Sequence, residues 1–365
     1  MNKEIYFAAG CFWGAQHFFA QVLGVKEATA GYANGHRAEA PTYEEVYTDT
    51  TGFAETVKVV YDEQKTSLQE LVSLFFEIID PTGVNRQGGD VGTRYRTGVY
   101  YTDAAERSVI EAVFEEEQQR QSAPLVVELE PLHNFFPAEE RHQAYLDKNP
   151  GGYCHVPLKT FRYLRLYQDL RLLLEGESDA VARMANTAAL IAERMHFFWT
   201  GFYRVSPDGK ELVLGPFQGP AAGFRIGFGK GGCGTAWKKR QSVVVPDVEQ
   251  FPGHIACSAA SRSEIVVPLL ARRERLPQCS ILTLRNGEPS TPPTGAGSNA
   301  SVPFKRLLLF LLRDDGKSGL GNLTSCFIAD YHFYIPPEKV FNRPARIEVH
   351  HLNDLVRYAH LGRIV

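Results

Sequence analysis

Residues Ile5-Tyr6-Phe7-Ala8-Ala9-Gly10-Cys11-Phe12-Trp13-Gly14 contain the transition that decides the fold of the first part of the chain. The apolar run before Gly10 is typical of a buried strand, and a helical pattern follows from about Gly14 to Leu23. Cys11 therefore falls at a strand-to-helix turn. At a helix N-terminus the free N–H groups and the dipole favour a thiolate and lower the cysteine pKa. The spacing alone is equally compatible with a buried, inert cysteine.

Length and composition limit the classes of function that remain. The chain has 365 residues, which is enough for about two to three domains. The formal net charge of −3 excludes a strong global attraction to nucleic acid or to an anionic membrane. The longest apolar run, Leu307 to Leu312, is too short to span a bilayer. No signal peptide is recognisable, and we expect a cytoplasmic protein.

Six cysteines are scattered along the chain without any Cys-x-x-Cys pair: Cys11, Cys154, Cys233, Cys257, Cys279 and Cys326. This spacing excludes zinc ribbons and a disulfide-rich scaffold. We therefore expect no metal site and no bound cofactor.

The Cys11 turn and five further motifs occur in an order that resembles one family. These motifs are Gly31-Tyr32, Pro41-Thr42-Tyr43, Thr51-Gly52-Phe53-Ala54-Glu55, Gly88 to Arg96, and Asn149-Pro150-Gly151-Gly152-Tyr153-Cys154. Residues 3 to about 158 resemble the A-type peptide methionine sulfoxide reductases. The resemblance implies an α/β sandwich with a mixed sheet and flanking helices, in a domain that we place at 1–158.

The resemblance also implies a role for each motif residue. Cys11 would be the nucleophile that attacks the sulfoxide sulfur, and Glu55 would be the acid that protonates the departing oxygen. Tyr43 and Tyr95 would be the hydroxyl groups that hold this oxygen, and Asp90 would be a further polar residue of the pocket. Phe12 and Trp13 would form the wall that holds the S-methyl group. All of these roles are carried over from the family motifs.

Recycling would use the second cysteine of this domain. By resemblance, Cys154 would condense with a sulfenic acid on Cys11, and thioredoxin or another dithiol would reduce the resulting disulfide. The expected substrates are oxidised proteins and methionine sulfoxide, in the S configuration. Two positions depart from the family pattern, Gln16 and Phe53, and neither is expected to be catalytic.

A second stretch, 160–274, resembles the GAF-type free methionine-R-sulfoxide reductases, which implies a domain with a central antiparallel sheet. The matching motifs are Leu174 to Glu177, Met184 to Ala188, Trp199 to Tyr203, Leu214 to Gly219, Gly231 to Ala236, Gly253 to Cys257, and Ser263 to Pro268. The resemblance implies that Cys257 is the nucleophile, that Cys233 resolves it, and that Trp199, Tyr203 and Glu264 line the pocket. Gly223 stands where many members have another resolving cysteine. Alternatively, this half is a small-ligand sensor that regulates the reductase, or an unfolded passenger.

The last part of the chain, 275–365, departs from that pattern. The family has a strand of the type Val-Leu-Asp-Ile-Asp-Ser, whose aspartates bind the ligand, whereas this chain has Cys279-Ser280-Ile281-Leu282-Thr283-Leu284. Codons that encode Gln278 to Thr294 can spell the missing strand when they are read two nucleotides later. We hypothesise a frameshift, or a sequencing error, near Leu276. It predicts a poorly ordered tail, loss of a central strand and of a closing helix, and an impaired second site.

Overall fold

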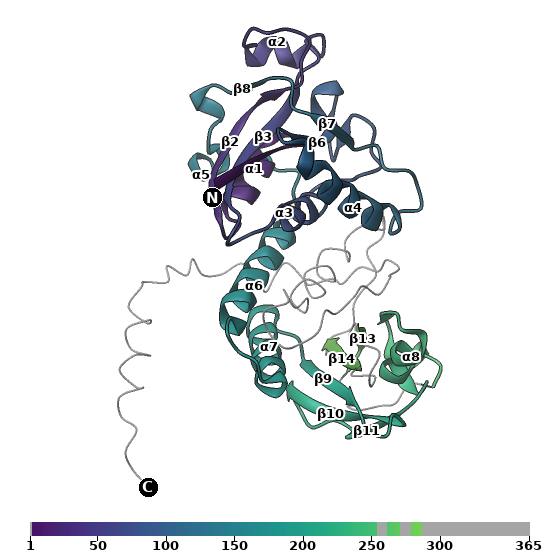
Figure 1. Cartoon of the computed structure of the whole chain (residues 1–365). Helices are drawn as coiled ribbons and strands as arrows, with labels where there is room; N and C mark the ends of the chain where they lie inside the picture. Colours follow the sequence, from purple (N-terminus) through teal and green to yellow (C-terminus); the bar gives the residue numbers. More distant parts are fainter. Residues whose placement is uncertain (1, 254–260, 271–278, 287–365) are drawn as a thin grey trace, which may run out of the picture.

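The computed structural model describes residues 2–253, 261–270 and 279–286, and Figure 1 traces them in sequence order. The helices are α1 (Phe12–Ala20), α2 (Tyr43–Tyr47), α3 (Leu68–Phe75), α4 (Arg107–Gln118), α5 (Tyr145–Lys148), α6 (Leu158–Leu174), α7 (Ala180–Met195) and α8 (Gly231–Lys239). The strands of the first half are β1 (Asn2–Ala9), β2 (Val25–Ala33), β3 (Ala54–Asp62), β4 (Arg86–Gln87), β5 (Asp90–Val91), β6 (Thr97–Tyr101), β7 (Glu128–Pro131) and β8 (Phe135–Pro137). Those of the second half are β9 (Trp199–Val205), β10 (Glu211–Gln218), β11 (Arg225–Gly227), β12 (Val243–Val245), β13 (Ser263–Leu270) and β14 (Cys279–Asn286).

The first half is built on a mixed sheet with strand order β7-β6-β1-β3-β2-β8. Only the β6–β7 pair is parallel among these neighbours, and β1 lies centrally between β3 and β6. The alternation along β1 assigns its two faces, because successive side chains of a strand point to opposite sides. Phe7 packs into the main core beside α1 and α3, whereas Tyr6 joins a smaller cluster on the other face. The predicted sandwich with flanking helices is confirmed.

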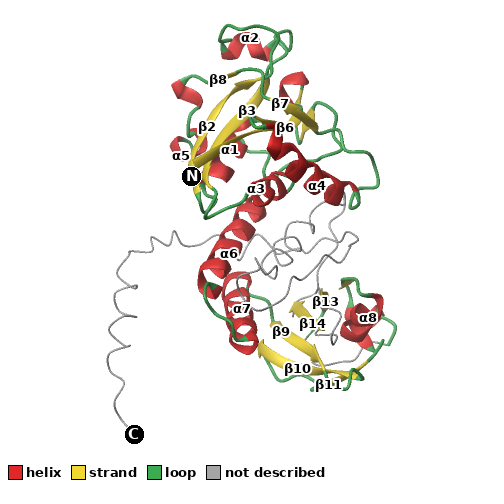
Figure 2. Ribbon diagram, viewed as in Figure 1, coloured by secondary structure: helices red, strands yellow, loops and turns green. Residues whose placement is uncertain are grey.

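The second half contains an antiparallel sheet with strand order β11-β10-β9-β14-β13-β12, as expected. Helix α7 packs against β9 and β10, and α8 contacts β12 and β13 (Figure 2). The sequence pattern predicts one helical stretch from Tyr167 to Met195, but the structure has two helices there. The second begins at a cap, because the Asp179 side chain accepts a hydrogen bond from the N–H of Ala182 at 2.8 Å.

The predicted loss of a central strand is wrong. Residues Cys279–Asn286 form β14, which pairs with β9 on one side and with β13 on the other. Backbone hydrogen bonds build a strand ladder, so a different sequence can occupy the same place when, like this one, it contains no proline. The rest of the predicted aberrant tail, 275–278 and 287–365, lies outside the described residues.

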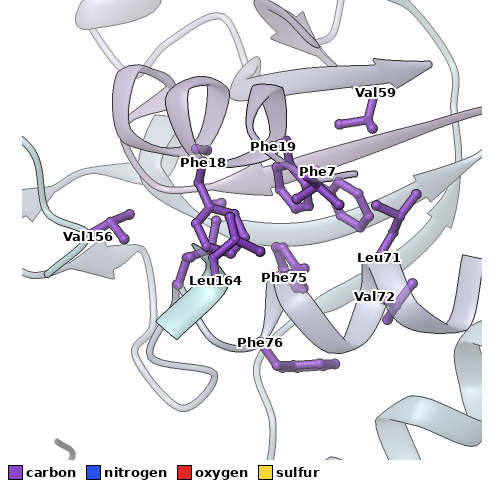
Figure 3. Packing of buried hydrophobic residues seen from close by; sticks show 14 of the residues in the cluster. Phe7, Phe18, Phe19, Val59, Leu71, Val72, Phe75, Phe76, Val156 and Leu164 are labelled. Atoms are coloured by element: carbon purple, nitrogen blue, oxygen red, sulfur yellow. The ribbon is translucent and has the colours of Figure 1, made fainter. Parts of the chain in front are cut away.

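Helix α6 connects the two halves and packs against the first of them. Figure 3 shows Leu164 of α6 close to Phe18, and both belong with Phe75 and Val156 to one buried cluster. The same buried cluster continues through Leu170 into α7 and the second sheet. The two predicted domains therefore share one continuous hydrophobic core. Among the described residues, none of the helices is long and apolar enough to cross a membrane.

Candidate active site

Cys11 lies at the N-cap of α1, and its thiol is buried beside a second chemically active group. Glu55, on β3, is almost completely buried, and its Oε2 accepts a hydrogen bond of 2.9 Å from the N–H of Phe12. The first free N–H of the helix is thus bonded to a carboxyl group. Strand β3 and the start of α1 together bring the predicted nucleophile and the predicted acid to one place.

The pKa values of Cys11 and Glu55 both lie above those of the same groups in water. Burial raises the pKa of the Cys11 thiol well above its ordinary value, and Glu55 and Asp90 act in the same direction. The N–H of Trp13 lowers the pKa, but not enough to compensate. The predicted net lowering by the helix N-terminus is therefore wrong, because desolvation penalises the thiolate more than the helix terminus stabilises it.

Glu55 is predominantly a neutral carboxylic acid near neutral pH. Burial raises its pKa to about 8, and the Phe12 N–H and Arg94 partly oppose this shift. A neutral acid can donate a proton, which the ionised form cannot.

Two tyrosines face the same carboxyl group from different elements. Tyr43 begins α2, whose N-terminus is held by a capping box formed by Thr42 and Glu45. Tyr95 is buried in the 3-10 turn Thr93–Tyr95. Burial and the proximity of Glu55 raise the pKa of both, that of Tyr43 to about 12. Both hydroxyls therefore keep their protons and can donate hydrogen bonds to an oxygen atom.

Asp90 lies on β5, opposite Gln87 of β4. Its charge raises the pKa of both Cys11 and Glu55, so its carboxylate also belongs to the site. One of its oxygens, Oδ2, is buried without a hydrogen-bond partner of acceptable geometry. The structure thus brings together Cys11 and all four predicted polar groups.

An aromatic wall extends from the Cys11 turn. Trp13 stacks on Tyr145 with the ring centroids 3.8 Å apart, and its Nε1 donates to Nδ1 of His142 at 3.3 Å. The His142 ring lies 4.4 Å from that of Tyr43. Phe12 is buried in the core and contacts the rings of Tyr32 and His142. Trp13 is the more accessible of the two predicted wall residues.

Cys154 lies over the start of the same helix. A Cβ at position 14 would be 2.9 Å from its Sγ, so only the absence of a side chain at Gly14 allows this approach. The sulfur contacts the carbonyl oxygen of Val156 at 3.5 Å, and burial raises its pKa. Both Cys11 and Cys154 are free thiols in this structure. The two predicted redox cysteines therefore border one helix turn.

Gln16 and Phe53, which depart from the family pattern, both make contacts inside the first half. The amide of Gln16 bonds to the carbonyl of Ala28, to the Gln143 side chain and to the N–H of Ala144. Phe53 is buried and packs edge-on against Phe136. The contacts of Gln16 and Phe53 are thus made with α5, β2 and β8.

Several residues of the site were not predicted from the sequence. Glu139 accepts hydrogen bonds from the hydroxyl of Tyr32 and from the N–H of Tyr43, and so fixes α2 to β2. Asp49 and Arg94 form an ion pair beside Tyr95. Arg94 stands inside a quoted motif, but its neighbours there give no indication of a partner 45 residues earlier.

The second half has its own buried polar cluster. Trp199 and Tyr203 of β9 pack with Cys233 of α8 in one cluster. The Cys233 thiol lies 3.7 Å from Oε1 of Glu264, which is buried on β13. Four of the five predicted residues are therefore together. Cys257, the predicted nucleophile, lies outside the described residues.

The loop after β10 closes over this cluster. The Trp199 Nε1 donates to the carbonyl oxygen of Pro220 at 3.0 Å, and the hydroxyl of Tyr203 donates to that of Gly223 at 2.9 Å. Gly223 is the position at which many members of the family that this half resembles have another resolving cysteine. The two aromatic side chains are thus held by the backbone of the loop.

Comparisons with known proteins agree with the arrangement in the first half. A family model described as peptide methionine sulfoxide reductase matches residues 3–169. The peptide methionine sulfoxide reductase MsrA of Clostridium acetobutylicum is 51% identical over 160 residues, which cover 44% of this chain and 98% of that protein. The MsrA of Lachnoclostridium phytofermentans is also 51% identical, over 156 residues, which cover 43% of this chain and 93% of that protein. A site that pairs two thiols with a neutral carboxylic acid is typical of a thiol-dependent reductase. The chain belongs to the peptide methionine sulfoxide reductase family.

Similar solved structures include members of two families. Mxr1 from Saccharomyces cerevisiae in its reduced form is 38% identical, with a TM-score of 0.42, over 43% of this chain and 92% of that chain. A free methionine-R-sulfoxide reductase from Neisseria meningitidis, solved with its substrate, is 39% identical, with a TM-score of 0.38, over 43% of this chain and 87% of that chain.

Proposed function

We propose that the first half reduces the S epimer of methionine sulfoxide, free and in proteins, with Cys11 as the nucleophile and Glu55 as the acid. The observation that carries the proposal is the direct contact between the turn that bears Cys11 and a carboxyl group with a pKa of about 8. Reduction of a sulfoxide needs a nucleophile for sulfur and a proton for oxygen. These two groups supply both.

The chemical step moves one oxygen atom from the substrate to the enzyme. The Cys11 sulfur attacks the sulfoxide sulfur, while Glu55 donates a proton to the sulfoxide oxygen and Tyr43 and Tyr95 donate hydrogen bonds to it. The S–O bond then breaks, the hydroxyl group passes to the Cys11 sulfur, and the thioether leaves. The proton of the Cys11 thiol restores the acid form of Glu55. The products are methionine and a sulfenic acid on Cys11.

The recycling step uses Cys154. Its sulfur attacks the sulfur of the sulfenic acid, a Cys11–Cys154 disulfide forms, and the hydroxyl leaves as water with the Cys154 proton. An external dithiol, which we propose to be thioredoxin, reduces the disulfide with two electrons. The short distance of Cys154 from the start of α1 supports this order of events.

For the second half we propose an impaired site for free methionine-R-sulfoxide. The cluster of Trp199, Tyr203, Cys233 and Glu264 supports a pocket of this kind. Strand β14 occupies a central position in the sheet, but its sequence contains no aspartate. The two anionic ligand contacts expected in such a strand are therefore missing.

The test is the chirally resolved loss of racemic free methionine sulfoxide, with the purified chain and dithiothreitol as reductant. We expect only the S epimer to disappear, and Cys11→Ser to abolish this loss. Cys257→Ser is the matched control and should change nothing. Persistence of the S activity in Cys11→Ser would contradict the role of Cys11.

The same experiment distinguishes the possible states of the second half. Loss of the R epimer that depends on Cys257 would contradict the proposed impairment. A change in the S-epimer rate on addition of a small ligand, without any R-epimer loss, would instead identify the second half as a sensor that regulates the reductase.

A further inference from the structure

Asp49 holds an unusual backbone conformation next to the active site. Its φ angle is 61°, a left-handed conformation that is strained for most residues other than glycine. In this conformation its carboxylate accepts hydrogen bonds of 3.0 Å from the Thr93 hydroxyl and from the N–H of Arg94. The same carboxylate forms an ion pair with the Arg94 guanidinium. Three contacts thus compensate for the strained backbone.

A glycine makes room for this pair. The backbone of Gly92 has a φ of 144°, and a Cβ there would lie 2.6 Å from Oδ2 of Asp49 and 2.7 Å from Nη1 of Arg94. Any side chain at position 92 would therefore separate the acid from the base. The ion pair fits this turn closely.

The guanidinium of Arg94 lies between two tyrosine rings. Its Cζ is 4.1 Å from the centroid of the Tyr47 ring and 4.5 Å from that of Tyr95, distances typical of cation–π contacts. Nη1 also donates to the carbonyl oxygen of Tyr47 at 3.2 Å. The Arg94 side chain is 9% exposed, so its charge is poorly screened by solvent. The ion pair, the backbone carbonyl and the two rings together hold the guanidinium in place.

We propose that Arg94 is a positioning residue of the reductase: anchored by Asp49, it holds the Tyr95 ring in place and keeps a fixed positive charge beside Glu55. The inference rests on the roles proposed above for Glu55 and Tyr95. Arg94 does not touch the substrate in this scheme. It acts through the two groups that donate hydrogen bonds and a proton to the sulfoxide oxygen.

The charge of Arg94 acts against several others around Glu55. The titratable and charged groups that influence Glu55 or are influenced by it are Cys11, Tyr32, Tyr43, Asp90, Arg94 and Tyr95. Burial and Asp90 raise the pKa of Glu55, whereas Arg94 lowers it. Arg94 is the only cation among the groups named. Removal of its charge should therefore raise the pKa of Glu55 above about 8 and keep the acid form present at higher pH.

The experiment measures the single-turnover rate of methionine formation from methionine-S-sulfoxide between pH 6 and pH 10, without reductant. For Arg94→Gln we expect a rate about tenfold to a hundredfold lower at pH 7, because Tyr95 loses its support. We also expect the alkaline limb of the profile to move to higher pH. For Arg94→Lys, which keeps the charge, the rate should fall but the alkaline limb should stay in place.

Two control variants complete the design. Arg107→Gln removes one positive charge from an exposed helix surface and should leave both rate and profile unchanged. Glu55→Gln tests the proposed function itself and should abolish methionine formation. If Glu55→Gln retains the rate, both proposals fail. If Glu55→Gln is inactive while Arg94→Gln has the wild-type alkaline limb, or behaves like Arg94→Lys, only the role of Arg94 is overturned.

Discussion

At the residue scale, the surroundings of Glu55 decide its charge and therefore its chemistry. A carboxyl group in water has lost its proton well below pH 7, but burial shifts the equilibrium of Glu55 toward the neutral acid. The same burial makes the Cys11 thiol a weaker acid than an exposed cysteine. Before a substrate binds, the carboxyl group of Glu55 and the thiol of Cys11 therefore both carry a proton.

This arrangement reduces stability in a pH-dependent way. The pKa of Glu55 is higher in the folded protein, about 8, than in the unfolded chain, where it is near 4.5. The ionised form is therefore disfavoured on folding, and stability falls as the pH rises from about 4.5 to about 8. Glu55→Gln removes this loss, and its amide oxygen can still accept from the N–H of Phe12. We expect it to stabilise the protein by about 4 kcal/mol at pH 8.

The measurement is urea unfolding of wild type and Glu55→Gln at pH 5 and pH 8. The difference in the free energy of unfolding should be about 1 kcal/mol at pH 5 and about 4 kcal/mol at pH 8. The exposed carboxylate of Glu44, which pairs with Arg141, provides the control variant Glu44→Gln. An equal effect of Glu55→Gln at the two pH values would show that the charge of Glu55 is not responsible.

At the element scale, the start of α1 positions both cysteines. Cys11 caps this helix, and Cys154 lies against Gly14 in the first turn. The approach is possible because Gly14 has no side chain. The first step of the reaction needs only the cap position of Cys11, whereas the recycling step also needs this close approach. A change at position 14 should therefore separate the two steps.

Gly14→Ala places a Cβ 2.9 Å from the Sγ of Cys154 and 3.2 Å from a methyl group of Val156. Such overpacking costs about 1–3 kcal/mol, and we expect it to displace Cys154. Disulfide formation after one turnover should slow about tenfold or more, while the first methionine still forms. Quenched samples analysed for methionine and for free thiols would measure both steps. A parallel decrease in the two rates would contradict the prediction.

The second sheet shows which features of its strands could be predicted from the sequence. The antiparallel character of the second sheet was predicted from resemblance, and the structure confirms it. The presence of β14 was not predicted, because the motif that this segment lacks is defined by side chains that bind a ligand. Main-chain pairing depends less on those side chains. A segment can therefore retain its place in a sheet and still lack the groups that a site needs.

At the scale of the whole molecule, α6 joins the two halves, because it packs against the first and leads into the second. Tyr167 and Arg171 of this helix both bond to the buried carboxylate of Glu70 on α3, at 2.7 and 2.5 Å. Arg171 also donates to the carbonyl oxygen of Lys65, and Gln168 accepts from the N–H of Leu23. The family match extends to residue 169, inside this helix. Helix α6 thus packs with the first half and begins the second.

We expect the wild-type chain to unfold in a single transition, because the buried cluster crosses the junction. Arg171→Met removes one partner of a buried ion pair and leaves the Glu70 carboxylate without its cation. This should cost about 3 kcal/mol and split the unfolding into two transitions. Differential scanning calorimetry measures the effect. Arg225→Met breaks an exposed pair with Glu211 and should leave one transition, whereas two transitions in the wild type would contradict the shared core.

The local features of the chain could be predicted from its amino-acid order. The strand, turn and helix around Cys11 follow from the order of apolar residues and Gly10, since these preferences act between near neighbours. The motif residues that gather at the site, Cys11, Tyr43, Glu55, Asp90 and Tyr95, were identified through the resemblance of their motifs to one family.

Other properties depend on contacts between residues that are distant in the sequence, and these could not be predicted. Burial, which the sequence does not reveal, sets the raised pKa of Cys11 and of Glu55. The pairing of Asp49 with Arg94 joins residues from two separate turns. The anchoring of α6 on Glu70 and the central place of β14 likewise arise from contacts between segments far apart in the chain. Such contacts form only when the whole chain has folded, because desolvation and long-range packing are properties of the assembled core.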